Sequence, residues 1–342
     1  MMGVIKKIGA FGGRLIASTG GYSADSASFG SAVARAKWKR QISGRDTKAY
    51  VEQVAAYVQA VLAPLTRQYA TAGYASTLCA KARPGDTPVW FCWWQGEAHM
   101  PDTVRLCYAR AKSMAPDPAA VHLITLKNVR DYVDFPPVIE EKYYARTLHL
   151  QALTDVLRAT LLCAYGGVWV DPYLYIARPL ADVLPTGAFF SPKLHYRVDS
   201  SPSQGLWNSK LLYVPANPVS MNYVREAFTL WWSVNEGALD ERLFDYFLLN
   251  AYRSLDAARA EIDAVEPNNI PVNALQVILH EPYSRARFAA LETQCAFFDI
   301  SSDAPWRLRT DAGEETLFGF LYHRAFGQDP EKGAPAEDAA SE

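Results

Sequence analysis

Three charged residues lie around a long apolar stretch in the middle of the chain, and their spacing could bring them to one ligand. Asp155 and Arg158 are three residues apart in the segment 148–165, whose leucines recur at helical spacing. Residues three apart project from one face of a helix, so an acid and a base would point together. Asp171 follows the apolar run 168–170, which is typical of a buried strand. We expect these three side chains to converge on one polar ligand.

A carboxylate at the end of a buried strand is costly unless something pairs with it. In open α/β sheets the carboxyl ends of the strands are also where ligands bind. A second interpretation needs no ligand: Asp155 and Arg158 would form an ordinary helix ion pair, and Asp171 would cap a turn. Spacing alone does not decide between the two.

The elements that would position these residues alternate in type. Gly166 and Gly167 should end the long helix, because glycine readily takes the left-handed conformation at a helix end. Upstream, the pattern predicts strands at 89–94 and 121–126 and helices at 104–114 and 139–144. Downstream, it predicts strands at 187–191 and 206–214, helices at 217–232, 243–255 and 274–279, and a strand-like run at 317–322. Such alternation indicates an α/β fold with a mostly parallel sheet flanked by helices.

The order Asp155-x-x-Arg158, an apolar helix end, Gly166-Gly167, an apolar strand and Asp171 resembles the sugar-nucleotide signature of the capsular polysaccharide synthesis glycosyltransferases. These are relatives of the yeast-type mannosyltransferases and of the glucosylating toxin domains that share a DxD motif. The segments 93–96, 101–107 and 243–248 also resemble the family's opening strand, turn and first helix, and its later helix. Together these blocks cover roughly residues 88–276.

The resemblance implies a GT-A-type nucleotide-sugar-binding fold with an added N-terminal helical extension. It implies transfer of a sugar from a nucleotide-sugar donor to a saccharide or lipid-linked saccharide acceptor, in the synthesis of a bacterial capsular or other surface polysaccharide. Retention of the anomeric configuration and assistance by a divalent cation, Mn²⁺ or Mg²⁺, are implied as well. A non-catalytic relative that binds sugar nucleotide, or that scaffolds polysaccharide assembly, is the alternative. A nucleotidyl- or phosphosugar transferase ranks third, because it would need a phosphate-binding motif early in the chain.

The resemblance also implies roles for individual residues. The implied donor-binding residues are Trp93, Trp94, Gln95, Asp155, Arg158, Gly167 and Asp171; Asp171 is also the implied catalytic residue, and Asp171 and His323 are the implied metal ligands. Asp245 lies beside apolar residues on the predicted helix 243–255, which makes it a second catalytic candidate, as an acceptor-binding or general-base group. Either Trp93 or Trp94 would stack on the base, and at least one should lie in the core, because strand neighbours face opposite ways. For Asp245 and His323 the alternatives are a solvated helix-face acid and a surface histidine.

One position departs from the family pattern. The DxD motif reads Asp171-Pro172-Tyr173 here, so the second carboxylate is absent. This leaves open how a metal would be held, although Mg²⁺ commonly uses one or two carboxylates together with phosphates and waters.

Composition limits the remaining function classes. The chain has 342 residues, half of them hydrophobic, and a formal net charge of -2. That balance gives no support for nucleic-acid binding. No stretch approaches the apolar run of about 18 residues that a membrane span needs. The five cysteines are scattered and odd in number, which favours free thiols in a reducing compartment and hence a cytoplasmic location.

The chain is predicted to have three parts: a basic arm with a helical extension at 1–83, a GT-A-like glycosyltransferase domain at 84–326, and a disordered acidic tail at 327–342. Within the first part, a helix is expected from Asp46 to Tyr69, ending near Pro64. The basic residues before it are either a peripheral contact with anionic lipid at the inner face of a membrane or a poorly ordered terminus.

Overall fold

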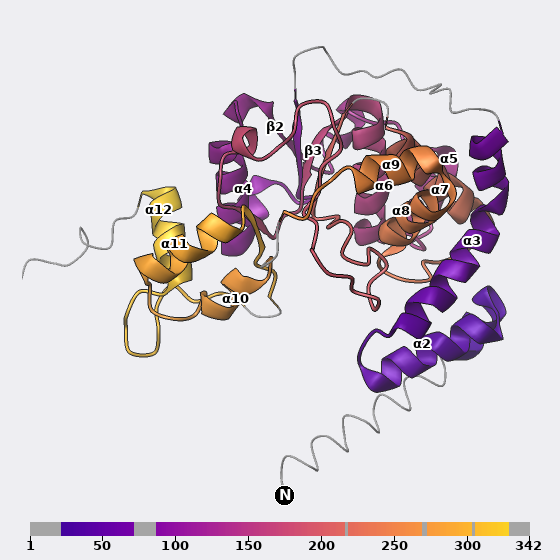
Figure 1. Cartoon of the computed structure of the whole chain (residues 1–342), viewed down its shortest axis with the longest axis horizontal. Coiled ribbons are helices and arrows are strands. Elements are labelled where there is room, and N and C mark those ends of the chain that lie inside the picture. Colours follow the sequence, from indigo (N-terminus) through magenta and orange to yellow (C-terminus); the bar gives the residue numbers. More distant parts are fainter. Residues whose placement is uncertain (1–21, 72–86, 216–217, 269–271, 303–304, 328–342) are drawn as a thin grey trace, which may run out of the picture. The chain divides into compact units, whose positions relative to one another are not determined.

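The chain is a mixed α/β protein with a mostly parallel sheet flanked by helices, as the alternation of elements predicts (Figure 1). The computed structural model describes residues 22–71, 87–215, 218–268, 272–302 and 305–327. The chain divides into two compact units. Unit 1 comprises residues 1–87, 128–169 and 185–267, and unit 2 comprises 88–127, 170–184 and 268–342.

Unit 1 is mainly helical. Its elements are α2 (Ser31–Ser43), α3 (Lys48–Thr71), η3 (Val129–Asp131), α5 (Pro137–Tyr144), α6 (Leu150–Tyr165), β3 (Gly167–Val170, whose last residue falls in unit 2), β5 (Leu211–Val214), α7 (Val219–Val234), α8 (Leu243–Ser254) and α9 (Asp256–Asp263). Helix α7 packs against α3, α5, α6, α8 and α9, so it is the centre of the helical core (Figure 1). Trp231 and Trp232 on α7 are fully buried there.

Helix α6 ends where the glycines predict. Leu157, Leu161 and Leu162 are fully buried, and this apolar face holds the helix against α7. Gly166 has a φ of 65° and Gly167 a φ of 91°. Backbone at these angles strains any residue that carries a Cβ, so the glycines stop the helix and turn the chain directly into β3.

Helices α2 and α3 pack on each other, and α3 packs on α7 and α8 (Figure 1). The predicted helix at 46–69 is observed as α3, but the prediction that it ends near Pro64 is wrong. Pro64 is exposed, whereas Leu62 and Leu65 beside it are buried. Apolar packing of Leu62 and Leu65 therefore stabilises the helix across Pro64. The described part of the basic segment before α3 is helical as well, at 22–29 and in α2.

Asp240 ties α3 to the connection between α7 and α8. Its side chain has no exposed surface and accepts hydrogen bonds from the Tyr50 hydroxyl (2.7 Å) and from Nε and Nη2 of Arg242 (3.0 and 3.1 Å). Arg242 also pairs with Asp46 just before α3, at 2.8 Å. The N-terminal helices are thus fixed to unit 1 by buried charges as well as by apolar packing.

Unit 2 contains shorter elements. They are β1 (Val89–Cys92), η1 (Glu97–His99), α4 (Asp102–Met114), η2 (Pro118–Ala120), β2 (Val121–Ile124), β4 (Leu174–Ile176), η4 (Leu180–Asp182), α10 (Ala274–Ile278), α11 (Arg285–Gln294), β6 (Phe297–Asp299) and α12 (Leu317–Phe326). Strands β1 and β2 pair in parallel, with Val89 opposite Val121. Strands β4 and β6 pair antiparallel, with Leu174 opposite Asp299. Helix α4 packs on β4 and α12.

Three strand predictions are corrected. The run 317–322 is helical, because Thr316 accepts a hydrogen bond from the Gly319 amide at 3.0 Å and so caps α12. Of the segment 206–214, only β5 is a strand. The segment 187–191 forms a single antiparallel bridge, between Phe190 and Tyr213.

Four cysteines, Cys92, Cys107, Cys163 and Cys295, are free and buried. Cys79, the boundary at 83/84 and the acidic tail from 328 lie outside the described residues, so the predictions about them stay predictions. None of the helices in the described ranges is long and apolar enough to cross a membrane.

Candidate functional site

Arg158 is held in unit 1 by one carboxylate and one backbone carbonyl oxygen. Its Nη2 donates to Asp155 Oδ1 at 2.7 Å, and its Nη1 donates to the Ser209 carbonyl oxygen at 2.8 Å. The guanidinium carbon lies 3.8 Å from the Phe244 ring centroid and 5.8 Å from that of Trp169. Asp155 and Arg158 are each only 6% exposed. The predicted pairing of acid and base is therefore a buried, desolvated ion pair rather than a solvated one on a helix surface.

Asp245 is held beside this pair by a different set of contacts. Its Oδ1 accepts from Trp207 Nε1 at 2.8 Å, and its Oδ2 from the Ser209 hydroxyl at 3.4 Å. The residue is half-buried at the start of α8, next to Phe244. Desolvation raises the pKa of the carboxyl group, and the positive charge of Arg158 partly opposes this shift.

These contacts define the polar cluster, by which we mean Asp155, Arg158, Trp207, Ser209 and Asp245. It joins two helices, α6 and α8, through the loop that precedes β5. The guanidinium of Arg158 is bound to one carboxylate, Asp155, and interacts electrostatically with a second, Asp245. Its Nε is buried without a hydrogen-bond partner among the described residues. A buried donor left in this way is uncommon in proteins, because it loses its hydration without compensation.

Asp171 belongs to unit 2 and follows directly after β3. Its Oδ1 accepts from the Tyr173 amide at 3.0 Å, which closes a tight turn. Burial raises the pKa of the Cys92 thiol, and the charge of Asp171 raises it further. The half-buried carboxylate of Asp171 therefore lies near the end of β1.

The segment after β1 carries the predicted base-stacking residues. Trp94 is 7% exposed and belongs to the core, whereas Trp93 is half-buried. The indole nitrogen of Trp93 donates to the His99 carbonyl oxygen at 3.2 Å. Gln95 is exposed, and its carbonyl oxygen lies 3.0 Å from His99 Nδ1. The expectation that at least one tryptophan is a core residue is confirmed.

His323 lies on α12, where its Nδ1 is 2.6 Å from Glu315 Oε1. Within the described ranges, no group of three or more histidines, cysteines, aspartates and glutamates could hold a metal ion. The described histidines, cysteines, aspartates and glutamates therefore do not fit a metal centre built from protein ligands alone. Asp171 and His323 as metal ligands, and the cation itself, stay predictions.

Comparison with known proteins gives the family. The model of a family described as capsular polysaccharide synthesis protein matches residues 39–317 of the chain. The chain belongs to this capsular polysaccharide synthesis family. The resemblance seen between Asp155 and Asp171 is thereby confirmed at the level of the family. No curated protein matches the chain. A solved structure titled PaToxG Glycosyltransferase is 12% identical with a TM-score of 0.34, and the match covers 81% of this chain and 97% of that one.

In this member of the capsular polysaccharide synthesis family, unit 1 brings together Asp155, Arg158 and Asp245. Sequence reasoning grouped Asp155 and Arg158 with Asp171, and considered Asp245 separately. It did not find Trp207 or Ser209, which lie in a stretch predicted to be a strand. No local signal could have identified Ser209, because its carbonyl oxygen acts through the backbone and its hydroxyl contacts Asp245, 36 residues further along the chain.

Proposed function

We propose that the protein is a glycosyltransferase that moves a sugar from a nucleotide-sugar donor to a saccharide or lipid-linked saccharide acceptor. Membership of the capsular polysaccharide synthesis family supports a role in surface polysaccharide formation. The observation that carries the proposal is the polar cluster of unit 1, in which a buried guanidinium is paired with Asp155 and interacts electrostatically with Asp245. Structural ion pairs are usually satisfied on all sides, whereas this cluster leaves a buried donor without a partner.

The reaction needs a bond exchange at the anomeric carbon. An acceptor hydroxyl oxygen forms a bond to that carbon, the bond from the carbon to the diphosphate breaks, and the nucleoside diphosphate leaves with the electron pair. The hydroxyl proton must pass to a base. We assign that role to Asp245, because a raised pKa brings a carboxylate closer to the acidity that proton transfer near neutral pH requires.

Arg158 has two of its donor nitrogens engaged by Asp155 and Ser209. We therefore propose that it acts through its positive charge and by holding Asp155 in place, rather than as a free fork that grips the diphosphate. Asp171, with Trp93 and Gln95 of the same unit, would contact the donor. A divalent cation, if bound with the donor phosphates, would offset charge on the leaving group, with Asp171 as its protein ligand.

The test is release of nucleotide from a panel of UDP-, GDP- and CMP-sugars, with and without Mn²⁺ or Mg²⁺. We expect one donor class to be turned over. We expect Asp171→Asn and Asp245→Asn each to lower kcat/KM at least about a hundredfold, the lower end of the range for acid–base groups. Asp256→Asn is the matched control, since the Asp256 side chain is 98% exposed. Equal activity in all variants would reject the assigned residues.

A second outcome would favour the non-catalytic relative. The second carboxylate of the DxD motif is absent, because Tyr173 occupies its position. If a nucleotide sugar raised the thermal unfolding temperature but was neither hydrolysed nor transferred, the chain would be a sugar-nucleotide-binding scaffold. Retention of configuration, a cytoplasmic location and peripheral contact with a membrane belong to this proposal as well.

A further inference from the structure

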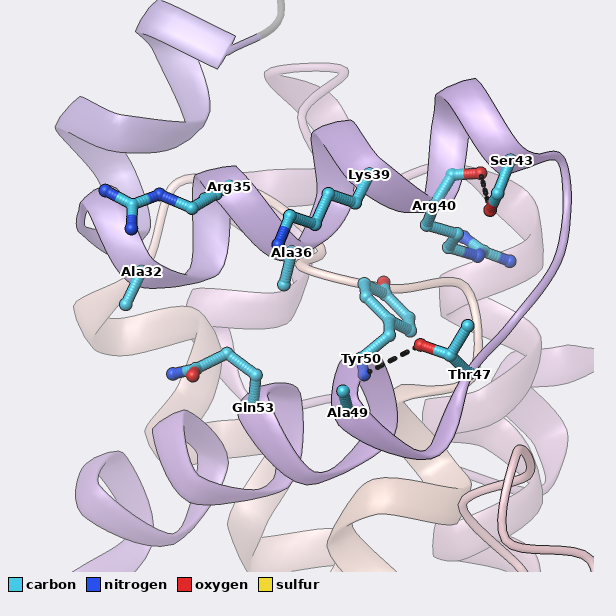
Figure 2. A pocket seen from close by; sticks show the side chains of 10 residues that line it. All are labelled: Ala32, Arg35, Ala36, Lys39, Arg40, Ser43, Thr47, Ala49, Tyr50 and Gln53. Atoms are coloured by element: carbon cyan, nitrogen blue, oxygen red, sulfur yellow. Dashed lines mark hydrogen bonds between the residues drawn. The ribbon is translucent and has the colours of Figure 1, made fainter.

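Helices α2 and α3 border an open pocket of about 340 Å³. Figure 2 shows its lining, with α2 and α3 contributing from opposite sides and Thr47 from the connection between them. The lining residues are Ala32, Arg35, Ala36, Lys39, Arg40, Ser43, Thr47, Ala49, Tyr50 and Gln53. The pocket lies wholly within unit 1, and none of its residues belongs to the polar cluster.

The lining is strongly unbalanced in charge. It includes three cations and no acid. Arg40 is neutralised, because its Nε pairs with Asp46 at 2.6 Å and its Nη2 with Glu241 at 3.2 Å. Arg35 and Lys39 are exposed and form no ion pair with any described residue. They lie one helical turn apart on α2, so two positive charges that no acid of the described chain pairs with border one opening.

The neutral polar groups of the pocket are mostly used within the protein. The Ser43 hydroxyl donates to the Arg40 carbonyl oxygen at 3.1 Å. The Thr47 hydroxyl accepts from the Tyr50 amide at 3.2 Å (Figure 2). The Tyr50 hydroxyl is bound to Asp240, which leaves its ring to line the pocket. Apart from the Gln53 amide, the binding capacity left over is therefore cationic.

The rest of the lining is apolar. Ala32, Ala36 and Ala49 present methyl groups, and Ala32 and Ala49 are exposed. A small polar anion would gain nothing from these surfaces, whereas an amphiphile could place its anionic group on the cations and its glycerol or chain carbons on the methyl groups. The mixed lining therefore favours a lipid over a soluble phosphate.

We propose that the pocket between α2 and α3 binds the phosphate of an anionic phospholipid headgroup, with Arg35 and Lys39 as the charged contacts. Each basic residue near an anionic membrane surface adds to the attraction, and the effect falls off within a Debye length. This site is independent of sugar transfer, so it would hold even if the chain proved to be non-catalytic.

The experiment is co-sedimentation of the full chain with vesicles of phosphatidylcholine alone or mixed with phosphatidylglycerol, at physiological ionic strength. Three proteins are compared: wild type, Arg35→Glu/Lys39→Glu, and Arg45→Glu/Arg285→Glu. The last pair makes the same change in net charge at exposed residues that do not line the pocket. Circular dichroism melts confirm that all three fold.

We expect the wild type to bind only the anionic vesicles. Charge reversal at Arg35 and Lys39 should weaken that binding about tenfold or more, since two attractions become repulsions. The control pair should change it less than about threefold, and millimolar inorganic phosphate should not compete. Failure of the wild type to bind anionic vesicles would overturn the proposal, as would equal weakening in both variants. Release of the vesicles by inorganic phosphate would reassign the pocket to soluble phosphate and overturn the lipid assignment.

Discussion

The guanidinium of Arg158 is held by contacts within the protein itself. Asp155 and Ser209 take two of its donors, and Phe244 covers its face. Removing one member of a buried ion pair is expensive, because the other charge stays buried without its partner. Loss of activity in a single variant of Asp155 or of Arg158 therefore reports on folding as well as on chemistry. The effects on stability and on activity must be measured separately.

A double-mutant cycle makes that separation. We expect Arg158→Met and Asp155→Leu each to lower the free energy of unfolding by about 3–5 kcal/mol, because each leaves one buried charge. The double variant should lose clearly less than the sum of the two, because both charges leave together. Urea denaturation at neutral pH measures all three. Additive losses would mean that the two side chains do not depend on each other, contrary to their 2.7 Å contact.

Substitution of Asp245, unlike that of Asp155 or Arg158, should not lower the stability of the protein. Its pKa in the folded protein is raised, so the ionised form is disfavoured there and destabilises the fold above the pKa of the unfolded chain. Asp245→Asn removes this penalty and keeps an oxygen for the Trp207 indole. We expect the variant to be as stable as wild type or more so at pH 7.

The pH dependence checks the sign of this effect. Any advantage of Asp245→Asn should shrink as the pH falls through the raised pKa, because the wild-type carboxyl then becomes neutral as well. Urea denaturation at neutral and mildly acidic pH follows it. A variant that is strongly destabilised at pH 7 would show instead that the charge of Asp245 helps to hold the fold.

At the scale of elements, Asp240 fixes α3 and the start of α8 in unit 1. Burial alone would raise the pKa of Asp240, but hydrogen bonds and charge from Arg242, together with the Tyr50 hydroxyl, outweigh it and lower the pKa. The stabilisation is therefore present above the unfolded-state pKa of about 4 and is lost as the pH falls towards the folded value.

We expect Asp240→Asn to lower the free energy of unfolding by about 3 kcal/mol at neutral pH, because Arg242 loses its buried partner. The difference from wild type should narrow as the pH falls below about 4. Asp256→Asn, at a fully solvated acid, serves as the control and should change little. A difference that stays constant down to acidic pH would contradict the assignment.

How far the elements could be predicted depends on where their deciding contacts lie. Helix α6 and its end at Gly166 were predictable, because spacing and glycine both act locally. The run 317–322 was not, because its apolar residues suit either a strand or a buried helix. The Thr316 cap and the left-handed Gly327 decide for the helix. In the candidate site, the pairing of Asp155 with Arg158 was readable from spacing. The contacts of Trp207 with Asp245 and of Ser209 with Arg158 join residues 38 and 51 positions apart, which spacing within one element cannot reveal.

At the scale of the whole chain, the family match begins at residue 39, inside α2, and therefore includes α3. The division into compact units agrees with the family match, since unit 1 includes the N-terminal helices as well as residues 128–169 and 185–267. The N-terminal helices are thus part of the folded core of unit 1 and not a separate extension of it.

Removing residues 1–83 should therefore destabilise the fold of the remaining chain. Four residues of α3 are fully buried: Val51, Val54, Val58 and Leu62. Burying side chains of this size stabilises a fold by about 6–12 kcal/mol in all, which is comparable to the whole stability of a typical protein.

We expect a chain that starts at residue 84 to bind a hydrophobic dye strongly and to lose its near-ultraviolet circular dichroism. The full chain carrying Ala56→Ser, a change at an exposed position of the same helix, should keep both wild-type signals. A shortened chain that unfolded cooperatively with native-like aromatic signals would show that α7 and α8 hold together without α3.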